Sequence, residues 1–139
     1  MRRSFAAGML AGFAGLTFAG EANAACKRGL TNVYKDRYIE ARVVTSWCYS
    51  NGNVTTRHSR PSAKVTDVGH ALGLRESAAE WTYSECHGFN GFPKHNCLTK
   101  RQFSFSNTYV PWAPKIGVCI ETRIYGNGAH KRNIRGECS

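Results

Sequence analysis

The 139-residue sequence predicts a mainly β fold: a small, disulfide-stabilised antiparallel β-sandwich or barrel, with room for one short helix. Three observations support this prediction. Short runs rich in Val, Ile, Thr and aromatic residues alternate with polar residues, which is typical of half-buried strands. Asn-Gly pairs at 51–52 and 127–128 provide tight turns between such runs. Six cysteines, an even number in a chain with an export signal, indicate a disulfide framework.

The N-terminus has the three parts of a secretory signal peptide. Arg2 and Arg3 supply positive charge, residues 5–19 are uncharged and largely apolar, and Ala22-Asn23-Ala24 is a small-residue cleavage site. The apolar run is shorter than the about 20 residues that a membrane-spanning helix needs, and no later stretch is more apolar. We therefore expect cleavage after residue 24, a single secreted domain over residues 25–139, no transmembrane segment, and a monomer outside the cell.

The charge of the chain points to anionic partners. The whole sequence carries a formal charge of +10, of which Arg2, Arg3 and Glu21 account for +1, leaving +9 on the expected mature domain. A basic domain of this size is attracted to anionic polymers, glycans with acidic groups and cell-envelope surfaces. The lysines and arginines are dispersed along the chain, so the sequence contains no linear basic arm.

All six cysteines lie in the mature domain, at positions 26, 48, 86, 97, 119 and 138. Cys86 and Cys97 flank a short glycine-rich loop and form the best local pair. The others fit two schemes: Cys26–Cys138 with Cys48–Cys119, or Cys26–Cys48 with Cys119–Cys138. Because no Cys-x-x-Cys occurs, zinc is not expected, and the sequence predicts no metal and no cofactor.

Residues 39–59 form the clearest predicted hairpin. Asn51-Gly52 supplies the two positive-φ residues of a type I′ turn. This turn sets a register in which Tyr49 faces Val54, Trp47 faces Thr56, and Thr45 faces His58. The expected core face consists of Val43, Trp47, Tyr49 and Val54, and Cys48 falls on the opposite face.

Residues 116–135 form a second predicted hairpin around Asn127-Gly128. Its buried face should hold the four alternating apolar residues Ile116, Val118, Ile120 and Ile124. A two-residue turn pairs Tyr125 with His130, Arg123 with Arg132, and Glu121 with Ile134. The outward face should then bring together five polar side chains: Glu121, Arg123, Tyr125, His130 and Arg132.

The remaining elements are weaker. Residues 64–68, 80–84 and 98–106 are expected to be strands, and 70–79 is either a helical turn or a strand. Residues 111–114 form a loop, because two prolines remove backbone donors.

The Trp47-Cys48-Tyr49-x-Asn51-Gly52 hairpin, the aromatic strand with Phe103 and Phe105, and the closing hairpin with Cys119 resemble those of uncharacterised small secreted disulfide-containing β-proteins of actinobacteria. This resemblance covers most of the mature chain. It implies a secreted β-fold and nothing about activity.

The leading functional hypothesis is a non-enzymatic binder of an anionic or glycan-bearing surface, because the domain is basic and lacks nucleophile-elbow, Walker and zinc-protease motifs. An enzyme is the less favoured alternative. The proposed binding residues lie in the loop between Cys86 and Cys97 and on the last hairpin: Phe89, Phe92, Lys94, Tyr125 and Arg132.

Two other functions remain open. The first is a secreted ribonuclease-type toxin, with Glu121 as base, His130 as acid, and Arg123 stabilising the transition state. The second is a protease inhibitor that presents the disulfide-braced loop of residues 88–96 to a protease.

Overall fold

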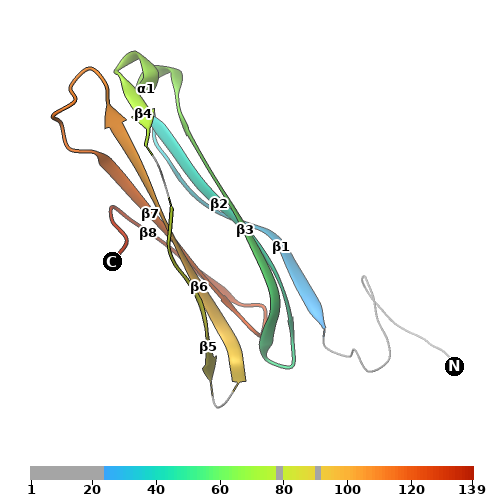
Figure 1. Ribbon diagram of the computed structural model, residues 1–139. Helices are drawn as coiled ribbons and strands as arrows, with labels where there is room; N and C mark the ends of the chain where they lie inside the picture. The colour runs from blue at the N-terminus through green and yellow to red at the C-terminus, as the bar shows by residue number, and fades with distance from the viewer. Residues whose placement is uncertain (1–23, 78–79, 90–91) are drawn as a thin grey trace, which may run out of the picture.

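The computed structural model describes residues 24–77, 80–89 and 92–139, with the backbone alone at residues 80, 89 and 92–94 (Figure 1). Residues 1–23, which hold nearly all of the predicted signal peptide, lie outside this range. The elements in chain order are β1 (Ala25–Lys35), β2 (Ile39–Ser50), β3 (Asn53–Val65), α1 (Asp67–Ala71), β4 (Leu74–Glu76), β5 (Glu80–Phe89), β6 (Phe92–Asn107), β7 (Ile116–Tyr125) and β8 (His130–Arg135).

Two antiparallel sheets face each other as a β-sandwich, which confirms the predicted fold class (Figure 1). The first sheet has the order β1-β2-β3. The second has the order β4-β6-β7-β8, and β5 also pairs with β6. Strand β3 packs over β6, and β1 and β2 pack over β7. One short helix, α1, follows β3, with the Thr66 side chain accepting a hydrogen bond from the Gly69 N–H at its start.

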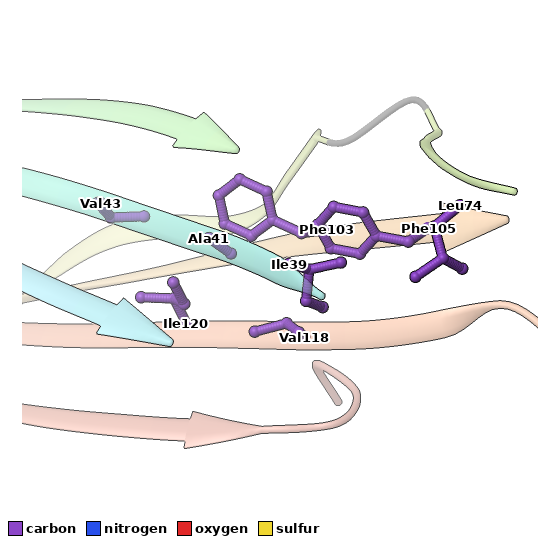
Figure 2. Packing of buried hydrophobic residues seen from close by; sticks show 8 residues of the cluster. All are labelled: Ile39, Ala41, Val43, Leu74, Phe103, Phe105, Val118 and Ile120. Carbon is purple, nitrogen blue, oxygen red and sulfur yellow. The ribbon is translucent and has the colours of Figure 1, made fainter. Parts of the chain in front are cut away.

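The core between the sheets contains two apolar clusters. The larger cluster surrounds Phe103 and Phe105 and includes Ile39, Val43 and Ile120 (Figure 2). The smaller one surrounds Trp47, with Val54, Ile124 and the Cys86–Cys97 disulfide. These clusters arise because alternate residues of each long strand point inward.

The three disulfides are Cys26–Cys48, Cys86–Cys97 and Cys119–Cys138. The local pair expected from the sequence is therefore confirmed, and the second of the two remaining schemes is the correct one. Two of these bonds join residues directly opposite each other in neighbouring strands, β1 with β2 and β5 with β6.

The register predicted for the first hairpin is confirmed next to the turn, but it is shifted by one residue further along the strands. Asn51 and Gly52 have φ values of 54° and 80°, as a type I′ turn requires, and Tyr49 pairs with Val54. A β-bulge then adds one residue to β3, so that Trp47 lies opposite Arg57 and Thr45 opposite Ser59. The expected pairs Trp47–Thr56 and Thr45–His58 are therefore wrong. Val43, Trp47 and Val54 nevertheless face the core.

The register predicted for the second hairpin is wrong by one residue. The loop contains three residues, 126–128, because the Gly128 N–H binds the Tyr125 carbonyl and the Tyr125 N–H binds the Ala129 carbonyl. Gly128 alone has a positive φ, of 89°, as in a type I turn followed by a bulge. Ile124 therefore pairs with His130, and Thr122 with Arg132. Since side chains alternate between faces, this shift moves every side chain of β8 to the other face.

Candidate functional site

The outer face of the second sheet carries a regular array of polar side chains. Across β6, β7 and β8, Lys100 lies opposite Glu121, and Glu121 lies opposite Asn133. In the next row, Arg123 lies opposite Leu98 on one side and Lys131 on the other. The alternation that buries Ile120 and Ile124 turns Glu121 and Arg123 outward.

These two rows enclose a shallow depression of about 260 Å³, here called the basic depression. Its lining consists of Leu98, Lys100, Glu121, Arg123, Lys131, Arg132 and Asn133. The Arg123 guanidinium donates a hydrogen bond of 2.6 Å to the Asn96 amide oxygen, which fixes its position. The Lys100 ammonium donates to the Ser139 carbonyl oxygen at 2.6 Å, and Lys131 is exposed. The arrangement can bind an anion between three cations.

Glu121 is the only carboxylate among these lining residues, and it is held by cationic and amide donors. Its side chain is 14% exposed and accepts hydrogen bonds from Arg135 and Asn133. Burial by itself would raise the pKa of Glu121, but the bonds from Arg135 and Asn133 outweigh burial and hold the pKa below its usual value. Glu121 is therefore ionised and already partnered at neutral pH, which suits a structural group better than a free general base.

Strand β5 extends the same face with a polar cluster that was not predicted from the sequence. The Tyr83 hydroxyl lies 2.7 Å from His87 Nε2 and 3.2 Å from a Glu85 oxygen. Burial raises the pKa of Tyr83, its contact with Glu85 raises it further, and Arg123 opposes both. The alternation of Tyr83, Glu85 and His87 along one strand was the signal available in the sequence.

The register turns the side chains of His130 and Arg132 away from those of Glu121 and Arg123, so the prediction that all four share one face is wrong, although Arg132 still borders the basic depression. The His130 ring lies edge-on to Trp47, with ring centroids 6.4 Å apart, and the Arg132 guanidinium donates to the Thr31 carbonyl in β1. Both residues therefore lie where β8 meets the first sheet. Because the three-residue loop turns β8 over, His130 cannot act with Glu121 on one bound group.

The other predicted binding residues are placed as follows. Tyr125 is half-buried in β7 opposite Asn96, and its ring packs edge-on against His95. The side chains of Phe89, Phe92 and Lys94 lie outside those that the structure describes, as does part of the loop expected to inhibit proteases. Of the predicted site residues with described side chains, Glu121, Arg123 and Arg132 line the basic depression, and Tyr125 and His130 do not.

Comparisons with protein-family models, with curated proteins and with solved structures give no match. Among the residues that the structure describes, no helix has the length and apolar character needed to cross a membrane.

Proposed function

We propose that this protein is an exported, basic β-sandwich that binds an anionic polymer of the cell envelope through the basic depression. The observation that carries this proposal is the cross-strand pair of Arg123 and Lys131, with Lys100 diagonal to Arg123 on the neighbouring strand. Like charges directly opposite each other destabilise a sheet. The repulsion between Arg123 and Lys131 therefore lowers the stability of the fold, and an anion bound between the two cations removes this repulsion.

The geometry fits a linear polymer that carries repeated negative charges. Lys100, Arg123 and Lys131 come from three adjacent strands, so their charges run across the sheet rather than into a deep pocket. Neighbouring side chains on one face of a sheet lie about 5 to 8 Å apart, so each of the three cations can contact a different negative charge of the polymer. A shallow, open site accepts such a chain along its length and does not need to enclose one unit.

The test is binding of labelled poly(glycerol phosphate) to the oxidised domain of residues 25–139, which contains every described element. The variant Lys100→Gln/Arg123→Gln/Lys131→Gln should bind at least about tenfold more weakly at low salt and show a smaller salt dependence, by about one phosphate contact for each cation removed. The matched control is Lys27→Gln/Lys35→Gln/Arg60→Gln, which removes the same charge from exposed positions of the first sheet. Equal binding by the two variants would refute the basic depression as the site.

The ribonuclease alternative is tested in parallel with total RNA at low salt. Because Glu121 and His130 lie on opposite faces, we expect RNA to be retained by the domain but not cut. Cleavage that His130→Ala removes would instead favour the ribonuclease and require a different active conformation. Cleavage that survives in His130→Ala and is lost in His87→Ala would point to the cluster on β5.

A further inference from the structure

Large apolar side chains gather at one end of the sandwich. We call this surface the apolar tip and define it by the exposed residues Val68, Leu72, Tyr109, Trp112 and Ile116. They belong to α1 and its C-cap, to the connection between β6 and β7, and to the start of β7, which lie together at the same end of the molecule (Figure 1). Trp112 is 83% exposed and Tyr109 is 67% exposed. Contiguous exposed apolar surface of this kind marks an interaction site.

The connection that presents Trp112 is a braced structure. The Asn107 side chain accepts hydrogen bonds from the Tyr109 and Val110 N–H groups at 2.9 and 3.0 Å. The Ala113 N–H binds the Val110 carbonyl, and two prolines flank Trp112 and its neighbour. The backbone that presents the indole is therefore ordered before any partner arrives, which lowers the entropic cost of binding.

The same bracing joins the two parts of the apolar tip. The Thr108 N–H and hydroxyl both bind the Gly73 carbonyl, at 2.8 and 2.9 Å. Gly73 has a φ of 88°, and a Cβ there would lie 2.7 Å from the Tyr109 ring, so the ring packs directly on the glycine. Leu72 precedes this glycine in sequence. The helix end and the β6–β7 connection consequently form one continuous surface.

Charge is arranged behind the apolar tip. The tip itself carries no net formal charge, because Arg37 and Lys115 offset Asp36 and Asp67. Close to the adjoining strand ends, a cationic collar of Lys35, Arg42, Lys64 and Arg75 lies with two carboxylates, Glu40 and Glu76, a net charge of +2. Arg42 and Lys64 are paired with Glu40, at 2.6 and 3.7 Å. An apolar end followed by a cationic collar matches the order of layers at an anionic bilayer, with acyl chains first and phosphates behind them.

We propose that the apolar tip inserts into the headgroup region of an anionic lipid bilayer. The indole of Trp112 and the phenol of Tyr109 are amphipathic rings of the kind that favour the membrane interface. The tip lies at one end of the sandwich and is built from α1, the β6–β7 connection and the start of β7, so it can meet a lipid surface end-on (Figure 1). This inference rests on residues separate from the basic depression and does not depend on the proposed polymer binding.

The experiment uses vesicles of phosphatidylglycerol and phosphatidylcholine in equal parts, with the oxidised domain of residues 25–139. Trp112→Ala and Tyr109→Ala should each weaken sedimentation with vesicles by about tenfold, since each removes a ring from the interface. Trp81→Phe, which changes an exposed tryptophan on β5, is the matched control and should sediment like the wild type. Unchanged circular dichroism and Tm will show that each variant is folded.

Fluorescence gives a second readout that does not depend on the loss of binding. In Trp81→Phe the remaining tryptophans are Trp47, which is 2% exposed in the core, and Trp112. Brominated acyl chains should therefore quench the emission of this variant through Trp112, and about 0.5 M NaCl should not abolish the quenching once the ring is inserted.

Three outcomes would overturn the inference. The first is sedimentation of Trp112→Ala equal to that of the wild type. The second is vesicle binding without quenching, which would mean adsorption by charge alone. The third is a tip that does not bind vesicles and binds a protein instead. The variant that lacks Lys100, Arg123 and Lys131 should retain quenching, so failure of the polymer proposal and failure of this one can be told apart.

Discussion

At the scale of single residues, Glu121 shows how the basic depression is held together. A carboxylate among so many cations neutralises part of their repulsion, and its bonds to Arg135 and Asn133 join β7 to β8. Lys100 and Arg123 remain directed to the same face. The role of Glu121 is therefore to support the site, and its ionisation should be visible in the stability of the fold.

Replacement of Glu121 by Gln should lower the free energy of unfolding at pH 7 by about 1 to 3 kcal/mol, because charged hydrogen bonds are lost. The pKa of Glu121 is lower in the folded protein than in the unfolded chain. Its stabilisation is consequently present above the unfolded pKa of about 4.3 and is lost as pH falls through the folded pKa. Urea unfolding of both proteins at several pH values should show their difference shrinking in acid. A constant difference would contradict this assignment, and Glu137→Gln is the exposed control.

At the scale of the elements, the sequence predicted strands better than it predicted their pairing. Alternation identified the inward faces of β2 and β7 because burial demands it, except at Ile116, which was expected in the core and is 42% exposed at the start of β7. Register depends on turn length, and Gly126-Asn127-Gly128 allows a loop of either two or three residues. Gly126 packs against the Gly52 carbonyl of the other hairpin, so a tertiary contact accompanies the longer loop. The two faces of β8, and with them the placement of His130 and Arg132, could not be read from local sequence.

The sequence also gave no sign of the polar layer that separates the two apolar clusters. Asn32, Thr45, Thr99 and Thr122 are all buried in the middle of the sandwich. Asn32 is 3% exposed, and its amide donates to the Glu121 carbonyl at 2.9 Å and to the Thr122 hydroxyl at 3.3 Å. These bonds link β1 of one sheet to β7 of the other. Since only one arrangement of the sheets satisfies them, they fix how the sheets align.

Replacement of Asn32 by Ala should destabilise the domain by about 1 to 3 kcal/mol, because it opens a small cavity and leaves buried acceptors without a donor. Ser62→Ala, at an exposed position of β3, should change stability by less than about 0.5 kcal/mol. Chemical denaturation of the two variants measures both values. An Asn32→Ala protein as stable as the wild type would mean that the polar layer does not hold the sheets in register.

At the scale of the whole molecule, the C-terminal segment closes the outer face of the second sheet. The Cys119–Cys138 disulfide holds it there, the Cys138 N–H donates to the Gln102 side chain at 2.7 Å, and Lys100 binds the Ser139 carbonyl. Cys119 is fully buried under this segment, although it points to the face that the sheet turns outward. The segment therefore adds a third layer at the edge of the basic depression.

Removal of the Cys119–Cys138 disulfide should lower the free energy of unfolding more than removal of Cys26–Cys48 does. The two bonds span 19 and 22 residues, so the chain-entropy loss is nearly equal, about 3 kcal/mol for each. Only Cys119→Ala/Cys138→Ala also uncovers a buried strand, because Cys26 is already exposed. The free energy of unfolding of that variant should therefore be lower than that of Cys26→Ala/Cys48→Ala by about 1 kcal/mol. This difference corresponds to the exposure of a few tens of Å² of apolar surface and the loss of the Gln102 bond. Urea denaturation of both double variants measures the difference. Equal losses would mean that the C-terminal segment is tethered to the sandwich without stabilising it.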